Sequence, residues 1–185
     1  MEDFVQRVNS DLIGKITNLA SRGAQMLGKK LDGKMGNLDP EGLELVKMAQ
    51  SKAEEISQHY QNRDFNRATQ AIRAIADEAN RYFEHKEPWK TLKVDIETTR
   101  VVLTTVLNVF RSCAIYLKPI LPEYTAKVER LFGESHYVWA DAQKILQHHE
   151  IASFEHLAQR IEMDDVQKML EASKEEGAQS EDVTK

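Results

Sequence analysis

The sequence predicts an all-α protein, a helical bundle of four to five long helices. Apolar residues recur at steps of three and four along most of the chain, which is the period of a helix with one buried face. The chain has only 8 Gly and 4 Pro among 185 residues, and no segment alternates apolar and polar residues as a half-buried strand does. Long helices joined by short loops are typical of a bundle.

The first third of the chain predicts two helices separated by a glycine-containing loop. Apolar residues fall on one face of residues 3–30 and predict the first helix there. Asp39 is placed as an N-cap, with Pro40 at the first helical position of the second helix. The apolar stripe of the second helix continues to Tyr60, and residues 62–64 interrupt it.

The third and fourth predicted helices occupy the middle of the chain. Asp64 can cap the third helix, which must end before Pro88 because a residue that precedes proline avoids the helical region. The fourth helix carries a wide apolar stripe from Val102 to Leu117, so we expect it to be the central helix of the bundle.

The next segment predicts a fifth helix followed by irregular chain. Pro122 is placed to open that helix, and Gly133 is placed to terminate it. Residues 135–160 are less periodic, so we expect a loop with short helical turns there.

The C-terminal end predicts one more helix and a tail. Asp164 and Gln167 resemble a capping box for a helix over residues 165–176. We therefore expect one helical domain at residues 1–176 and a polar, disordered tail at residues 177–185.

Composition and charge limit the classes of function. The single cysteine, Cys113, excludes an internal disulfide framework and a multi-cysteine zinc site, and we interpret it as a core residue. The longest apolar run, residues 101–110, is too short to cross a bilayer, and no signal peptide is evident, so we expect a cytoplasmic protein. A net charge of −5 argues against sequence-independent binding of phosphates. Any nucleic-acid binding must depend on a local site that holds unstacked bases.

Two features have chemistry suited to such a site, and each also has a structural interpretation. Asn18 and Arg22 are four residues apart and share a helix face, which is either a solvated polar surface or a site that contacts base edges. Trp89 follows Pro88, and its ring either closes the end of the bundle or offers a base a stacking surface.

Catalytic and metal-binding patterns are weak. His148, His149 and Glu150 are adjacent, so on a helix their side chains would point in different directions. No further ligand follows at a spacing typical of metal sites, so we expect no metal site. His85 is interpreted as a surface residue. No carboxylate pair or glycine-rich phosphate loop is evident.

Four segments stand out as landmarks: residues 3–22, ending in Asn-Leu-Ala-Ser-Arg; residues 79–89, ending in Lys-Glu-Pro-Trp; residues 110–122, ending in Lys-Pro-Ile-Leu-Pro; and residues 160–162. In order and separation they resemble the helical anticodon-binding domain of methionyl-tRNA synthetases, which are class I aminoacyl-tRNA synthetases. Related synthetases carry pieces similar to the second and third segments, and the combination with Asn-Leu-Ala-Ser-Arg points to methionine. The resemblance covers about residues 3–176.

The resemblance implies roles for five residues. Asn18 and Arg22 correspond to the polar pair that contacts base edges and backbone of the CAU anticodon in this family. Trp89, positioned by Pro88, corresponds to the tryptophan that stacks on the wobble cytosine, and Glu84 stands where relatives carry an acidic residue.

The family's Rossmann-type catalytic half, which activates methionine with ATP, has no counterpart in the sequence. We therefore expect an isolated domain that is not an enzyme by itself and holds no cofactor, within a parent methionine–tRNA ligase whose catalytic domain binds ATP and methionine. The expected partners are the anticodon loop of methionine tRNA and that catalytic domain, with neither membrane nor DNA.

The alternatives are a helical protein–protein scaffold, which predicts an exposed apolar groove, and a stand-alone enzyme, for which the sequence offers no acid–base or metal site.

Overall fold

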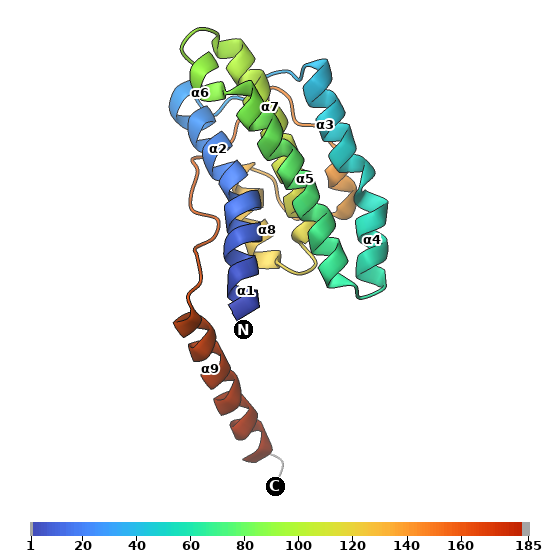
Figure 1. Ribbon diagram of the computed structural model, residues 1–185, viewed down its shortest axis with the longest axis vertical. Coiled ribbons are helices and arrows are strands. Elements are labelled where there is room, and N and C mark those ends of the chain that lie inside the picture. Colours follow the sequence, from blue (N-terminus) through green and yellow to red (C-terminus); the bar gives the residue numbers. More distant parts are fainter. Residues whose placement is uncertain (1, 183–185) are drawn as a thin grey trace.

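The first helical rod of the protein is continuous but not uniform. The computed structural model describes residues 2–182, with side chains through Ser173, and within that range it is a helical bundle (Figure 1). The rod consists of α1 (Glu2–Arg7), η1 (Val8–Thr17) and α2 (Asn18–Leu31). In η1 the backbone forms a wider π-helical turn, as where the Asn18 N–H donates to the Ile13 carbonyl. The predicted helix over residues 3–30 is confirmed, and the wide turn within it was not foreseen.

The second predicted helix is two helices, which corrects the sequence expectation. α3 (Pro40–Ser51) begins where predicted, because the Asp39 carboxylate accepts a hydrogen bond of 2.7 Å from the Gly42 N–H. α4 (Ala53–Gln61) follows after a break at Lys52. The Ser51 hydroxyl donates to the Met48 carbonyl at 2.7 Å, and such a bond competes with the helix's own hydrogen bonds and bends it.

Two helices of 22 residues form the centre of the bundle. α5 (Phe65–Lys86) is capped by the Asp64 carboxylate, and α7 (Ile96–Leu117) packs against α2, α3, α5 and α8. By length and composition alone α7 could cross a membrane, but 89% of the relevant window is buried inside the bundle. α7 is therefore the predicted central core helix.

A short helix, α6 (Pro88–Thr91), separates α5 from α7 and was not predicted. Glu87 adopts the left-handed conformation, with φ of 45°, and ends α5 at Lys86. Trp89 consequently lies on α6 and not at the end of α5. In Figure 1, α6 lies at the end of the bundle opposite α1.

The C-terminal part begins with α8 (Pro122–Leu131), which is followed by Gly133 at φ of 61°, as predicted. The predicted irregular segment contains a short 3₁₀ turn, η2 (Trp139–Gln143), and an antiparallel bridge between Lys34 and Glu150.

The last helix, α9 (Met163–Asp182), differs from its predicted limits. The Asp165 carboxylate, and not that of Asp164, accepts a hydrogen bond of 2.9 Å from the Glu162 N–H. The helix continues to Asp182, beyond the predicted end near Glu176, so part of the predicted tail is helical. Residues 183–185 lie outside the described range. In Figure 1, α9 extends from the end of the bundle at which α1 begins.

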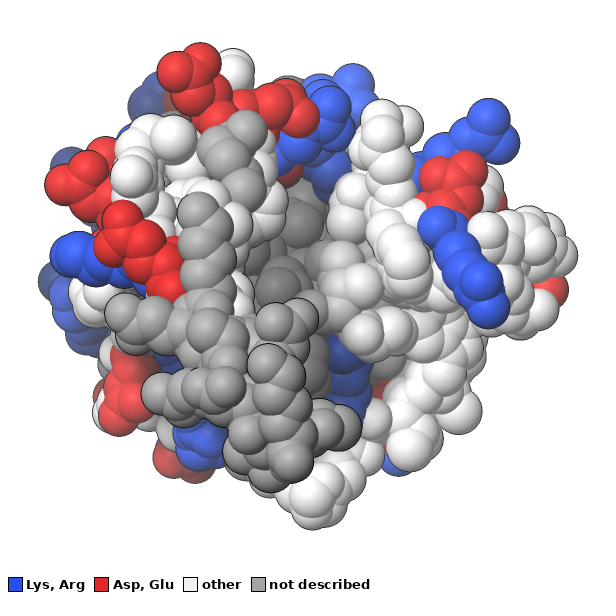
Figure 2. Space-filling view, turned by 90° about the horizontal axis from the view of Figure 1, so that it is seen from below, with Lys and Arg blue, Asp and Glu red and all other residues white. Residues whose placement is uncertain are grey.

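Charged residues on that end are mixed in sign. Figure 2 views it directly, and outside the residues drawn in grey, basic and acidic side chains alternate around the edge beside a broad uncharged area. The visible face thus lacks the continuous basic surface that sequence-independent binding of phosphates requires.

Candidate nucleic-acid interface

The predicted residues Arg22 and Trp89 meet at the α6 end of the bundle. The Arg22 Cζ atom lies 4.5 Å from the ring centroid of Phe83 and 5.6 Å from that of Trp89. The two rings are 5.9 Å apart, within the range of interacting aromatic pairs. Phe83 is buried, whereas Trp89 is 36% exposed, so one aromatic surface remains accessible.

Glu84 holds the guanidinium of Arg22 in this position. The Arg22 Nη1 atom donates to Glu84 Oε1 at 2.5 Å. The Arg22 side chain is 33% exposed, and the carboxylate that neutralises it is more exposed, at 57%. A planar guanidinium with one edge engaged and one face over aromatic rings presents its remaining donors in a defined direction.

The backbone around Pro88 sets the direction of Trp89. The left-handed Glu87 turns the chain sharply, and Pro88 then starts α6 with its ring buried. The hydroxyls of Thr91 and Thr99 are 2.7 Å apart and fasten α6 to α7. Pro88 therefore has a positioning role, because a buried ring offers no surface to a ligand.

Asn18 lies one turn before Arg22 on the same face of α2 and is exposed. No hydrogen bond within residues 2–173 involves its side chain. Together with Gln25 and Lys29, these two residues form a row at steps of four, three and four, which we call the polar ridge (Asn18, Arg22, Gln25, Lys29). Gln25 donates to the Ser21 hydroxyl at 3.0 Å, and Lys29 donates to the Gln25 side-chain oxygen at 3.4 Å.

A surface depression of about 500 Å³ lies beside the polar ridge, and we call it the aromatic hollow. Lys29 and Lys30 stand at its rim, and among the described residues its lining contains no carboxylate, although Glu84 stands next to Arg22. A cationic rim around exposed aromatic surface suits single-stranded nucleic acid. Its lining residues are Ser21, Arg22, Gln25, Met26, Lys29, Lys30, Phe83, Trp89 and Leu92.

The structure thus brings four of the five predicted residues together, namely Arg22, Glu84, Pro88 and Trp89, with Asn18 adjoining along α2. Sequence reasoning assigned no role in the site to Phe83, Gln25, Lys29 or Lys30. The helical steps after Arg22 contained the signal for Gln25 and Lys29. Phe83 lies within the second landmark, but the sequence alone did not show that it packs against Arg22.

The structure also contains the kind of groove that the scaffold alternative predicts. It measures about 760 Å³ between α3–α4 and α5, with Leu45, Met48 and Ile75 in its lining. Carboxylates and cations both line it, and several pair with one another, as Lys52 does with Glu55 at 2.7 Å.

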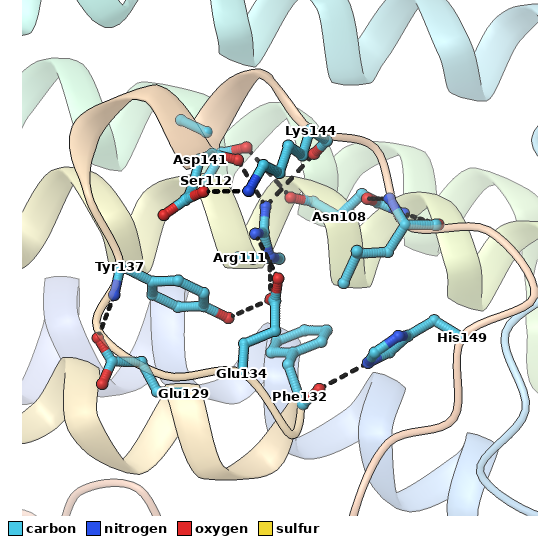
Figure 3. Close-up of polar contacts among 12 residues, drawn as sticks. Asn108, Arg111, Ser112, Glu129, Phe132, Glu134, Tyr137, Asp141, Lys144 and His149 are labelled. Atoms are coloured by element: carbon cyan, nitrogen blue, oxygen red, sulfur yellow. Dashed lines mark hydrogen bonds and ion pairs between the residues drawn. The ribbon is translucent and has the colours of Figure 1, made fainter.

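A second polar cluster, centred on Arg111, is fully engaged in holding the fold (Figure 3). Arg111 is 1% exposed, and its guanidinium donates to both oxygens of Glu134 at 2.6 and 2.8 Å and to the Asp141 carbonyl at 2.8 Å. The Tyr137 hydroxyl donates to Glu134 at 2.8 Å. Burial alone would raise the pKa of Glu134, but Arg111 and Tyr137 outweigh burial and lower it.

Asn108 completes the attachment of this loop to α7. Its amide donates to the Leu146 carbonyl and accepts from the Leu146 N–H, both at 2.8 Å. The cluster therefore fixes residues 134–146 against α7.

The two histidines considered and rejected as metal ligands, His148 and His149, have structural partners. His148 Nε2 lies 2.8 Å from the Asn37 side-chain oxygen, and His149 Nε2 lies 2.6 Å from the Phe132 carbonyl. Among the described residues, no three His, Cys, Asp or Glu side chains gather as metal ligands would.

Comparison with known proteins places the chain in a family. A family model described as the anticodon binding domain of methionyl tRNA ligase matches residues 33–175. A methionine–tRNA ligase of Bdellovibrio bacteriovorus is 57% identical over 171 residues, which are 92% of this chain and 25% of the relative. One of Psychrobacter arcticus is 40% identical over 176 residues, which are 94% of this chain and 25% of the relative.

Solved structures agree with this result. The crystal structure of free Mycobacterium tuberculosis methionyl-tRNA synthetase matches 87% of this chain and 34% of that protein, with a TM-score of 0.80 and 25% identity. The chain spans about a quarter of the length of the curated relatives it matches. From the fold, the ordered landmarks and these matches, we conclude that the chain belongs to the family of anticodon-binding domains of methionyl-tRNA ligases.

Proposed function

We propose that this domain recognises the CAU anticodon of methionine tRNAs as the anticodon-binding part of a methionine–tRNA ligase. The parent ligase would charge the tRNA with methionine using ATP, both bound by its catalytic domain. This domain would contribute binding energy and discrimination among tRNAs.

One observation carries the proposal: Arg22, from the first landmark, and Trp89, from the second, come from different helices and line the same aromatic hollow. A scaffold gives no reason for a guanidinium, an exposed tryptophan and two lysines to gather there. We assign Trp89 as the stacking surface for the wobble cytosine, since a base stacked on an aromatic ring contributes about 1–3 kcal/mol.

Asn18 and Arg22 supply polar contacts in this proposal. Asn18 offers an amide donor and acceptor with no partner among the described residues, and Arg22 offers guanidinium N–H groups beyond the one bonded to Glu84. Glu84 orients Arg22, and Pro88 orients Trp89. Lys29 and Lys30 would face the phosphates of the loop, which gives a protein of net charge −5 a local cationic surface.

The test is binding of a fluorescent CAU anticodon stem-loop, beside a stem-loop with the wobble cytosine replaced, at low and moderate salt. A preference for cytosine that persists at moderate salt is expected, because base contacts depend less on salt than phosphate contacts do. Equal binding of both stem-loops, lost as salt rises, would reduce the site to phosphate attraction. No binding, in the isolated domain and in the full-length ligase alike, would favour the scaffold alternative.

A further inference from the structure

A second hollow lies on the other side of the polar ridge. It measures about 800 Å³ and is bounded by α2 and by the extended segment at residues 150–156. Gln25 and Lys29 line both this second hollow and the aromatic hollow. The polar ridge therefore runs between two depressions, and each of them contains aromatic side chains.

The wall of the second hollow is fixed in position. The Ile151 N–H donates to the Gly33 carbonyl at 2.9 Å, and the Ala152 N–H donates to the Leu131 carbonyl at 2.8 Å. On this wall the rings of Phe154 and His156 are 6.1 Å apart and nearly perpendicular, with Phe154 half-buried and His156 exposed. The hollow thus exists before any ligand binds.

Open space lies above Gly28, one of the α2 residues that line the second hollow. Gly28 is exposed on α2, and a Cβ atom built there would meet no atom within 4 Å. A flat ligand can therefore approach the helix backbone between Gly28 and the two rings. Proteins commonly hold unpaired bases by stacking them on aromatic side chains. The open space above Gly28 and the rings of Phe154 and His156 therefore suit a nucleobase.

Charges define how a nucleotide would lie there. Lys29, Asp32 and Glu150 all line the second hollow, so one cation and two carboxylates face a ligand there. Phosphates would be repelled by the carboxylates and attracted by Lys29, so the sugar–phosphate chain would follow the ridge and the base would point toward Phe154 and His156.

We propose that the second hollow is an additional nucleotide subsite, which holds an unpaired base of the same RNA loop whose neighbouring base stacks on Trp89. The RNA chain crosses α2 over Gln25 and Lys29, and a base enters the hollow on each side. This inference rests on the proposed function, because the RNA that would fill the second hollow is the one that the aromatic hollow binds.

Gly28 allows a test in which the protein keeps its fold. Gly28→Leu places a side chain in the open space of the second hollow, and both Leu and Ala favour a helix more than Gly does. Gly28→Ala is the matched control, because it removes the glycine without filling the hollow. Stem-loop binding is expected to weaken about tenfold in Gly28→Leu, as loss of a stacked base predicts. Gly28→Ala is expected to stay within about twofold of the wild type.

The identity of the base is tested with stem-loops that carry one abasic site at each unpaired position in turn. For one loop position, removal of the base is expected to weaken binding to the wild-type protein. The same removal should not weaken binding to Gly28→Leu or to His156→Ala any further, because those variants have already lost the contact with that base. That position must differ from the one coupled to Trp89→Ala.

The outcomes separate this inference from the proposed function. If Gly28→Leu and Gly28→Ala bind the stem-loop equally, and no abasic position is coupled to Gly28→Leu, the second subsite is overturned. The proposed function still stands in that case if Trp89→Ala weakens stem-loop binding. A wild-type protein that shows no preference for the CAU stem-loop overturns both.

Discussion

Arg22 is held on two sides before any RNA is present, by the Glu84 carboxylate and by the rings of Phe83 and Trp89. A side chain with several rotatable bonds normally loses conformational entropy when it binds a ligand. The contacts in the free protein have already restricted Arg22, so less entropy remains to be lost on binding. Geometry as well as charge therefore makes Arg22 suitable for contacting a base.

Arg22→Lys should separate these two properties. Lysine keeps the positive charge but has no planar fork to stack on Phe83, so we expect stem-loop affinity to fall nearly as far as in Arg22→Ala. Affinity measured by fluorescence anisotropy checks this expectation. Retention of wild-type affinity by the lysine variant would mean that only charge matters at this position.

Trp89→Ala should affect RNA binding more than folding. The ring is partly exposed, and we expect stem-loop binding to weaken by about 1–3 kcal/mol, the contribution of one stacked base. Phe65 is an exposed aromatic residue at the start of α5 that does not line either hollow, so Phe65→Ala is the matched control and should bind normally. Thermal unfolding of both variants shows whether any loss of stem-loop binding results from a less stable fold.

Arg111 holds the loop at residues 134–146 through the Glu134 carboxylate and the carbonyls of Asp141 and Lys144. Arg111→Ala leaves the partly buried Glu134 carboxylate without its cation, and removal of one partner of a buried pair costs about 3–5 kcal/mol. Urea unfolding measures this change. Arg67→Ala, which breaks an exposed ion pair with Asp64, should change the free energy of unfolding by less than about 0.5 kcal/mol.

The same pair predicts how stability depends on pH. The folded protein lowers the pKa of Glu134 below its unfolded value, so the pair's contribution is complete above about pH 4.3 and is lost as pH falls through the lower, folded pKa. Glu134→Gln should therefore destabilise the protein near neutral pH, and its difference from the wild type should shrink in acid. Urea unfolding midpoints of the wild type and Glu134→Gln, measured near neutral pH and in acid, test this pH dependence. A difference between the two proteins that is the same at both pH values would contradict it.

At the scale of helices, local sequence signals located most boundaries. Asp39 and Asp64 each cap a helix where the sequence predicted, and Gly133 follows α8 in the left-handed conformation. These signals act within a few residues, so they can be recognised without the rest of the fold. Asp39→Ala should accordingly destabilise the protein by about 1 kcal/mol in urea unfolding, and Asp39→Asn by less.

Other boundaries depended on contacts that a sequence pattern does not contain. The break at Lys52 involves no Gly or Pro, and the single Gly14 within η1 does not by itself predict a π-helical turn. α6 depends on a left-handed Glu87, a residue type that rarely adopts that conformation. The candidate site shows the same division. Its motif residues could be placed on helices from the sequence, whereas their meeting with Phe83 depends on how α2, α5 and α6 pack.

For the whole molecule, net charge and local charge act in opposite directions. The protein carries −5 overall, yet the aromatic hollow has lysines at its rim and, among the described residues, no carboxylate in its lining. We expect the affinity for any stem-loop to fall as salt rises from about 50 mM to about 200 mM, with the ratio between CAU and wobble-substituted loops nearly constant. A ratio that falls with the affinity would contradict base recognition.

Beyond its first turns the central helix α7 is almost entirely buried, whereas all four side chains of the polar ridge reach solvent. Substitutions at Asn18, Gln25 and Lys29 therefore leave the core packing untouched, whereas Arg22 contacts the buried Phe83 and is tied to the core. Folding and recognition can consequently change independently at those three positions. A laboratory selection that varies Asn18, Gln25 and Lys29 alone should be able to move this domain toward another anticodon while its fold is preserved.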